Sequence, residues 1–180
     1  MAAAAGLAGA AESRPALSVA PAASLATALG FGAAALALIA GAAIGRDRGN
    51  RRILAGAVLA AGLFQVIYGT QQWFSRSRDI WGVDVSSNPA RLRGSFVNPN
   101  HFAVYIGIAL AVAFAWLWRA LRAARGEEEP ARCVWLVAPP LVIWLTLFAG
   151  LAFSESRSGL LAALGGVALQ GFLIAAARRN

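Results

Sequence analysis

Five long apolar segments, separated by short polar stretches, dominate this chain. They lie at about 25–44, 53–73, 102–121, 134–153 and 159–177, and their interiors carry almost no charge. Each holds roughly 19–21 residues, which in a helix rising 1.5 Å per residue span about 30 Å, the thickness of the hydrocarbon core of a bilayer. Because a chain in lipid must satisfy its own backbone hydrogen bonds, the segments should be helical. The pattern predicts an all-α, polytopic membrane bundle of about five transmembrane helices.

The residues before the first segment are rich in alanine and contain Pro15 and Pro21. A secretory signal begins with a basic region, and no basic residue precedes Arg14. We therefore expect a flexible, uncleaved N-terminal tail over 1–21, followed by one transmembrane helical domain over 22–180. A misassigned start or a missing upstream region is the alternative.

The composition agrees with a membrane protein. Hydrophobic residues make up 59% of the chain and charged residues 13%, about half the charged fraction of a soluble domain. The net charge is +8 and all sixteen basic residues are arginine, which by itself would raise nucleic acid as a partner. The arginines cluster between the apolar segments, where they act as topology signals, so no nucleic acid is expected. With one Cys, one His and eight acids, we expect neither a metal site nor a cofactor.

The distribution of arginine predicts the orientation. The connections 46–52 and 119–132 and the C-terminal Arg178 and Arg179 fall on one side of a bundle with five crossings. Loops rich in arginine stay in the cytoplasm. We therefore expect the N-terminus, the 74–100 connection and the 154–158 turn on the extracytoplasmic side, and the C-terminus inside.

Two polar stretches on that extracytoplasmic side contain candidate chemistry. The first, 91–105, combines Arg91, Arg93, Asn98, Asn100 and His101 at the start of the third segment. Asn98-Pro99-Asn100 is typical of a helix cap, which explains Asn100 but leaves both arginines and the histidine unexplained. A helix N-terminus flanked by arginine can bind an anion.

The second stretch, 153–159, joins two apolar segments and contains Glu155 and Arg157. Either these two side chains form a simple ion pair in a tight turn, or Arg157 serves a function at the start of the last helix. If both stretches converge, they suit a lipid whose head group carries phosphate.

At these residues the chain resembles a family. Gly94-Ser-Phe-Val-Asn-Pro-Asn-His-Phe-Ala-Val-Tyr105, followed by Ser156-Arg-Ser-Gly159, is similar to the core of the O-antigen ligase and O-antigen polymerase superfamily. Its members are multi-pass glycosyltransferases of the bacterial inner membrane. They transfer a glycan from a polyprenyl pyrophosphate carrier to an acceptor on the periplasmic side, without a metal. The resemblance implies that Arg157 belongs to the residues that bind pyrophosphate, and that Asn98, Asn100 and His101 shape this pocket. It assigns no catalytic residue here.

The family pattern also contains about a dozen helices and a large extracytoplasmic loop with a catalytic histidine, after the Ser-Arg-Ser-Gly helix. This chain ends at Asn180 before such a loop, and His101 does not occupy that place. We expect a fragment, a split gene product or a degenerate member, with a partner chain supplying further helices and no glycan transfer by the chain alone. The alternative function is a non-catalytic membrane subunit that binds a lipid-linked phosphate or a partner protein.

Overall fold

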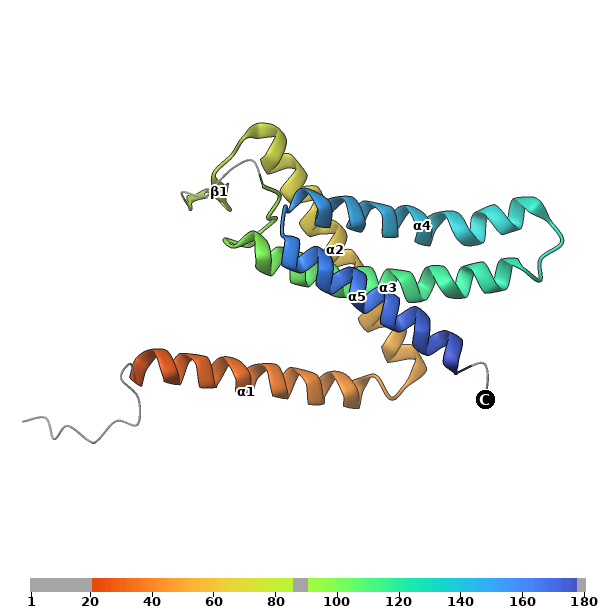
Figure 1. The fold of residues 1–180 in the computed structure, drawn as a ribbon, viewed down its shortest axis with the longest axis horizontal. Coiled ribbons are helices and arrows are strands. Elements are labelled where there is room, and N and C mark those ends of the chain that lie inside the picture. The colour runs from red at the N-terminus through yellow and green to blue at the C-terminus, as the bar shows by residue number, and fades with distance from the viewer. Residues whose placement is uncertain (1–20, 86–90, 178–180) are drawn as a thin grey trace, which may run out of the picture. The chain divides into compact units, whose positions relative to one another are not determined.

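The computed structural model describes residues 21–85 and 91–177, which form five long helices (Figure 1). They are α1 (Pro21–Ile44), α2 (Arg48–Ser75), α3 (Pro99–Ala124), α4 (Pro130–Phe153) and α5 (Arg157–Ala176). All five predicted helices are confirmed, and each begins earlier than its apolar segment. The apolar pattern marks the part that suits lipid, whereas the helix itself runs on to a capping residue or turn.

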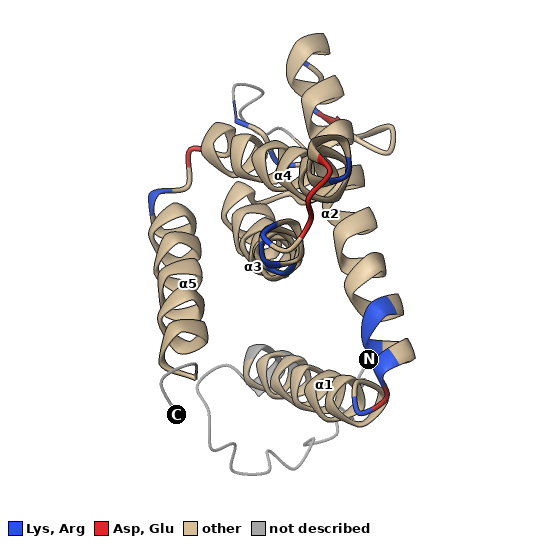
Figure 2. Ribbon diagram, turned by 90° about the vertical axis from the view of Figure 1, so that its right-hand side faces the viewer, with Lys and Arg blue, Asp and Glu red and all other residues tan. Residues whose placement is uncertain are grey.

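Each helix is long and apolar enough to cross a membrane, which indicates a multi-pass membrane protein. In Figure 2 the charged positions lie at or near the ends of helices and in the connections, and the middle parts are uncharged. Of the tail expected over 1–21, residues 1–20 lie outside the described residues. Pro21 is already the first residue of α1, a position where proline's missing N–H costs nothing.

The chain divides into two units, Met1–Arg51 and Arg52–Asn180. The first contains α1 and the start of α2. Asp47 precedes α2, and its Oδ2 accepts a hydrogen bond from the backbone N–H of Asn50 at 3.0 Å. This bond lowers the pKa of Asp47.

The core of the second unit is built around α3. Its buried side chains recur every three or four residues and so form one face that packs against its neighbours. This face comprises Phe102, Ala103, Ile106, Ala109, Leu110, Ala113, Leu117 and Ala120. α4 runs antiparallel to α3, and α5 also packs against α3 (Figure 1). α2 approaches both α3 and α4 at Gly62, where an added Cβ would lie 2.9 Å from the Ala109 Cβ and 3.1 Å from a methyl of Leu147.

A small β-hairpin, which the sequence did not predict, follows α2. Strands β1 (Asp79–Ile80) and β2 (Val83–Asp84) pair antiparallel. Trp81 and Gly82 between them have φ values of 54° and 80°, as a tight hairpin turn requires. The Trp81 ring stacks on Tyr68 of α2 at 4.8 Å, and its backbone N–H donates to the Tyr68 hydroxyl at 2.9 Å. The hairpin is therefore attached to α2.

Candidate functional site

The turn between α4 and α5 consists of Ser154, Glu155 and Ser156. Ser154 is buried, and its hydroxyl donates to the Leu151 carbonyl at 2.6 Å. Glu155 adopts a left-handed φ of 53°, which ends α4. The Ser156 hydroxyl caps α5 by accepting a hydrogen bond from the Gly159 N–H at 3.2 Å. This polar run therefore reverses the chain with its own side chains as caps.

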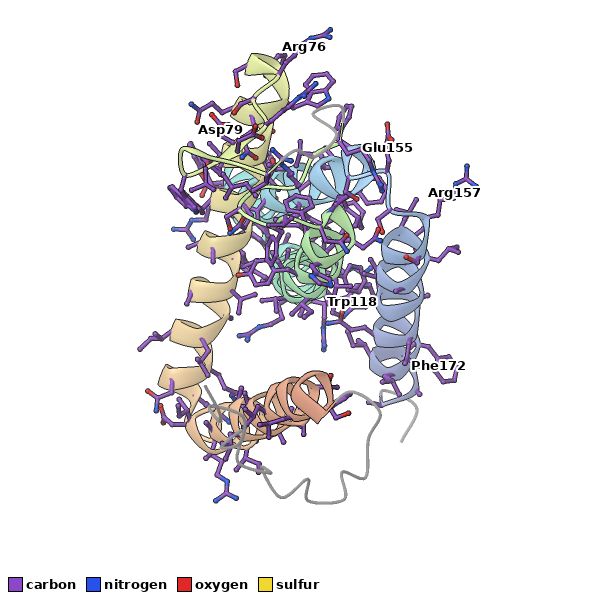
Figure 3. All side chains as sticks on the ribbon, turned by 90° about the vertical axis from the view of Figure 1, so that its left-hand side faces the viewer. Arg76, Asp79, Trp118, Glu155, Arg157 and Phe172 are labelled. Carbon is purple, nitrogen blue, oxygen red and sulfur yellow. The ribbon has the colours of Figure 1, made fainter. Side chains whose placement is uncertain are left out.

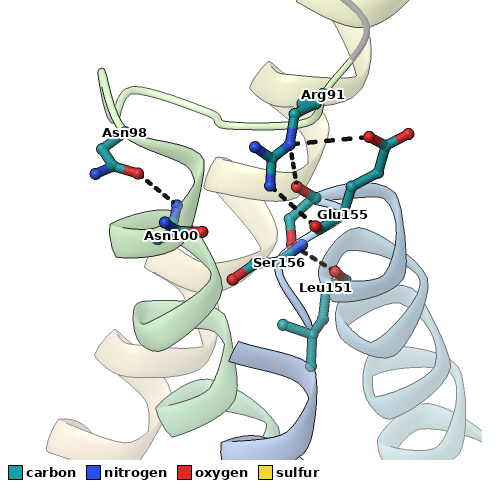
Figure 4. A network of polar contacts seen from close by, with 7 residues as sticks. Arg91, Asn98, Asn100, Leu151, Glu155 and Ser156 are labelled. Atoms are coloured by element: carbon teal, nitrogen blue, oxygen red, sulfur yellow. Dashed lines mark hydrogen bonds and ion pairs between the residues drawn. The ribbon is translucent and has the colours of Figure 1, made fainter. Parts of the chain in front are cut away.

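Arg91 binds this turn from the connection between the hairpin and α3 (Figure 4). Its Nε donates to the Ser154 carbonyl at 3.0 Å, and its Nη2 donates to the Glu155 carbonyl at 2.9 Å. The Arg91 Nε also lies 3.9 Å from Oε2 of Glu155. The neighbouring Leu92 N–H donates to the Phe153 carbonyl at 3.0 Å. A cation at this position satisfies the free carbonyls and the negative dipole end of α4.

Arg157 is placed differently from Arg91. It is the first residue of α5, its side chain is exposed, and Figure 3 shows it pointing away from the helices. No ion pair found within residues 21–85 and 91–177 includes Arg157. The alternative in which Glu155 and Arg157 form an ion pair is therefore wrong, because the carboxylate of Glu155 faces Arg91 instead.

The start of α3 is a regular helix cap. Asn98 is the N-cap residue, its Oδ1 accepts a hydrogen bond from the Asn100 N–H at 2.8 Å, and Pro99 follows as the first helical residue. Asn98, Asn100 and His101 are exposed, whereas Phe102 is fully buried. The helix cap expected in the Asn-Pro-Asn run is confirmed, but the capping residue is Asn98, and Asn100, for which the sequence offered this role, is already helical and donates to it. The Asn100 and His101 side chains remain available at the surface.

The two polar stretches meet where α5 crosses α3. A Cβ added to Gly159 would lie 2.5 Å from the Cβ of Ala103. About one turn further on, a Cβ at Gly107 would lie 3.3 Å from that of Ala163. The first turns of α3 and α5 therefore lie side by side (Figure 4). Asn98 already accepts the first N–H groups of α3, from Asn100 to its Oδ1 and from His101 to its carbonyl. At α5 the Ser156 hydroxyl accepts from Gly159, while the N–H groups of the two residues before Gly159 have no helical carbonyl within reach.

Arg93 belongs to another part of the connection. It is only 3% exposed, and its Nη2 donates to the Ser77 carbonyl at 3.4 Å, while its Nη1 is buried without a hydrogen-bond partner in the described ranges. Burial lowers the pKa of Arg93, and the charges of Tyr68, Asp79 and Asp84 oppose this shift. Arg91 and Arg93 were both candidates to lie beside Arg157. Arg91 contacts the turn 154–156 that precedes Arg157, whereas Arg93 faces the segment that contains the hairpin.

Sequence reasoning missed the residues of α2 that hold this connection. The Gln65 Oε1 accepts from the Ser95 N–H and the Gln65 Nε2 donates to the Ser95 hydroxyl, both at 2.8 Å. The Nε2 of buried Gln72 donates to the Asp79 carbonyl at 2.7 Å. Gly94, which directly precedes Ser95, has a φ of 58°, in the left-handed region that favours glycine. Glutamines inside an apolar segment were the available signal, since a polar group in lipid needs a partner.

An open hollow of about 320 Å³ lies at the junction of α4 and α5. Its lining includes Ala152, Glu155, Ser156, Arg157 and Leu160. An exposed guanidinium beside the N-terminus of a helix suits an anion, and the apolar residues of the lining suit a hydrocarbon chain. Such a combination fits a lipid with an anionic head group.

Comparison with known proteins adds no family to this description. No protein-family model, curated protein or solved structure matches the chain. The fold and the residues at the α3 and α5 N-termini define a multi-pass α-helical membrane protein with an arginine-bearing surface at one end of the second unit.

Proposed function

We propose that this chain is part of a membrane glycosyltransferase of the O-antigen ligase and polymerase type. It transfers a glycan from a polyprenyl pyrophosphate carrier to an acceptor on the extracytoplasmic face of a bacterial inner membrane. A partner chain or further helices complete the enzyme. This proposal rests on the similarity of segments 94–105 and 156–159 to that superfamily.

The contact between Ala103 and Gly159 is the observation that carries the proposal. The two segments are separated by the whole α3–α4 hairpin, yet their first helical turns lie against each other. A shared binding site for one head group requires this proximity. Two helix caps with unrelated roles would not require this proximity.

The position of Arg157 is further support. A cation at the first residue of a helix lies next to the positive end of the helix dipole, where it is unfavourable. Since Arg157 makes no ion pair within the described residues, helix stability does not explain it. A bound pyrophosphate would satisfy both the guanidinium and the free N–H groups of α5.

The chemistry that follows is substitution at the anomeric carbon of the donor. The bond from this carbon to the pyrophosphate oxygen breaks, the acceptor hydroxyl oxygen forms the new bond, and the hydroxyl proton leaves to a base. Negative charge grows on the departing pyrophosphate. A group that binds this charge more tightly as the charge grows stabilises the transition state and so lowers the barrier. We assign this role to Arg157.

Binding to the carrier lipid tests this proposal directly. The full chain in nanodiscs would be titrated with undecaprenyl pyrophosphate and, as a matched control, with undecaprenol. We expect clear preference for the pyrophosphate, because the tails are identical and only the head group meets Arg157. Equal affinity for the two lipids would contradict the proposal.

A further inference from the structure

The end of the second unit remote from the proposed glycan site contains a groove between α2, α3 and α4. Its volume is about 580 Å³. Arg52 and Gly56 of α2, Trp116 and Arg119 of α3, and Leu136 of α4 contribute to its lining. Apart from the two arginines and the indole N–H, the residues that line it are apolar. This groove has no part in the function proposed above.

The charge of the groove is uncompensated. Arg52 and Arg119 are both exposed, and no acidic residue lines the groove. The ion pairs of the described residues at this end involve a different arginine, Arg132, which lies 3.8 Å from Glu127 and 3.3 Å from Glu129. Within the part of the chain that the structure describes, two cations without an acidic partner therefore face one apolar cavity.

The two arginines lie on the same side of the contact between α2 and α3 and at similar distances from it along their helices. α2 crosses α3 obliquely (Figure 1), and the two helices touch where Gly62 approaches Ala109. Arg52 precedes Gly62, and Arg119 follows Ala109, each by about ten residues or about 15 Å of helix. If this contact lies near the middle of a bilayer, both guanidinium groups reach the head-group level. Trp116, which is 42% exposed, suits the same interfacial level.

We propose that this groove binds an anionic phospholipid. The phosphate lies against Arg52 and Arg119, and an acyl chain lies along the apolar floor past Gly56. Charge complementarity favours this occupant over an apolar helix, which would leave the two guanidinium groups unpaired. The acyl chain has space there, because a Cβ added at Gly56 would meet no atom within 4 Å. Basic pockets between transmembrane helices commonly hold such head groups.

Lipid retention by the purified full chain tests the role of the arginines. Native mass spectrometry would compare phosphatidylglycerol with phosphatidylcholine of identical acyl chains. We expect the wild-type chain to retain phosphatidylglycerol selectively, and Arg52→Gln/Arg119→Gln to bind it about tenfold or more weakly. The control Arg48→Gln/Arg132→Gln removes the same charge at residues that do not line the groove, and should keep wild-type binding. Equal loss in both double variants, or equal retention of the two lipids, would overturn the proposal.

A second pair of variants tests the groove itself. Gly56→Leu fills the floor and keeps both arginines, whereas Gly171→Leu adds the same side chain to α5, where an added Cβ also meets nothing within 4 Å. We expect only Gly56→Leu to lose phosphatidylglycerol, with unchanged helical content by circular dichroism. Full binding by Gly56→Leu would show that the arginines hold a head group or free phosphate without the groove. A dimer that excludes lipid would assign the groove to a second copy of the chain. Either result would overturn the proposal.

Discussion

Gly159 of α5 and Ala103 of α3 touch so closely that a Cβ on the glycine would lie 2.5 Å from the Cβ of the alanine. This contact joins the polar run 153–159 to the Asn-Pro-Asn cap of α3, although α3 and α4 separate them in the chain. The approach of these two helix starts is the geometric basis of the proposed pyrophosphate site. Its consequences can be measured.

The first prediction concerns this contact. Gly159→Ala should destabilise the protein by about 1–3 kcal/mol, because the added methyl group overlaps Ala103 and also approaches the Ser156 hydroxyl that caps α5. Thermal unfolding in detergent measures the change. Gly166→Ala in the same helix is the control, because an added Cβ there meets nothing within 4 Å and alanine favours the helix. Equal stability of the two variants would contradict the close contact.

The second prediction separates Arg91 from Glu155. Arg91→Ala should lower stability by about 1–3 kcal/mol, since it leaves the Ser154 and Glu155 carbonyls without their donor. Glu155→Gln should change stability by less than about 1 kcal/mol, because its carboxylate is 64% exposed and 3.9 Å from the Arg91 Nε. Chemical denaturation of both variants is the measurement. A larger loss for Glu155→Gln than for Arg91→Ala would reverse our assignment of this turn.

The third prediction concerns Arg157 as a binding residue. Arg157→Ala should weaken the binding of undecaprenyl pyrophosphate by about 1.5–3 kcal/mol, with little effect on stability, because the side chain is exposed. Arg157→Lys should lie between the alanine variant and the wild type, since lysine keeps the charge and loses the planar geometry. Titration in nanodiscs gives the affinities. The control is Arg78→Ala, because Arg78 is also exposed but lies next to the hairpin; this variant should bind undecaprenyl pyrophosphate as the wild type does. Unchanged affinity of Arg157→Ala together with lower stability would reduce this residue to a structural role.

The fourth prediction is the orientation. In a Cys133→Ser background, Val83→Cys in the exposed hairpin should react with an impermeant maleimide from the extracytoplasmic side. Gly126→Cys, in the connection between α3 and α4, should react only after the membrane is opened. The arginine-rich connections are the reason, because they favour the cytoplasm. The opposite labelling pattern would invert the whole assignment, including the side on which the glycan is transferred.

The number and type of helices could be predicted from the sequence alone. An uncharged apolar segment of bilayer length has to be a helix in lipid, whatever its neighbours are. A helix cap within the Asn-Pro-Asn run was also predictable, because capping depends on residues two or three positions apart, although the residue that caps is Asn98 and not Asn100. Only the ends of the helices differed, since apolarity and helix length are separate properties.

The contacts of the candidate site were decided by the tertiary structure. From the sequence, Glu155 and Arg157 are the obvious pair, yet the left-handed conformation of Glu155 and the helical start at Arg157 leave the carboxylate facing Arg91, which is distant in the chain. The partnership of Gln65 with Ser95 likewise depends on the connection folding back over α2. The apolar pattern of a segment indicates whether it suits lipid or water, which is a property of that segment alone. The partner of a polar group, in contrast, depends on which segments fold together. For this reason the sequence by itself determined the five helices, and only the packing of α2, α3, α4 and α5 decided which arginine caps the turn and which one remains exposed.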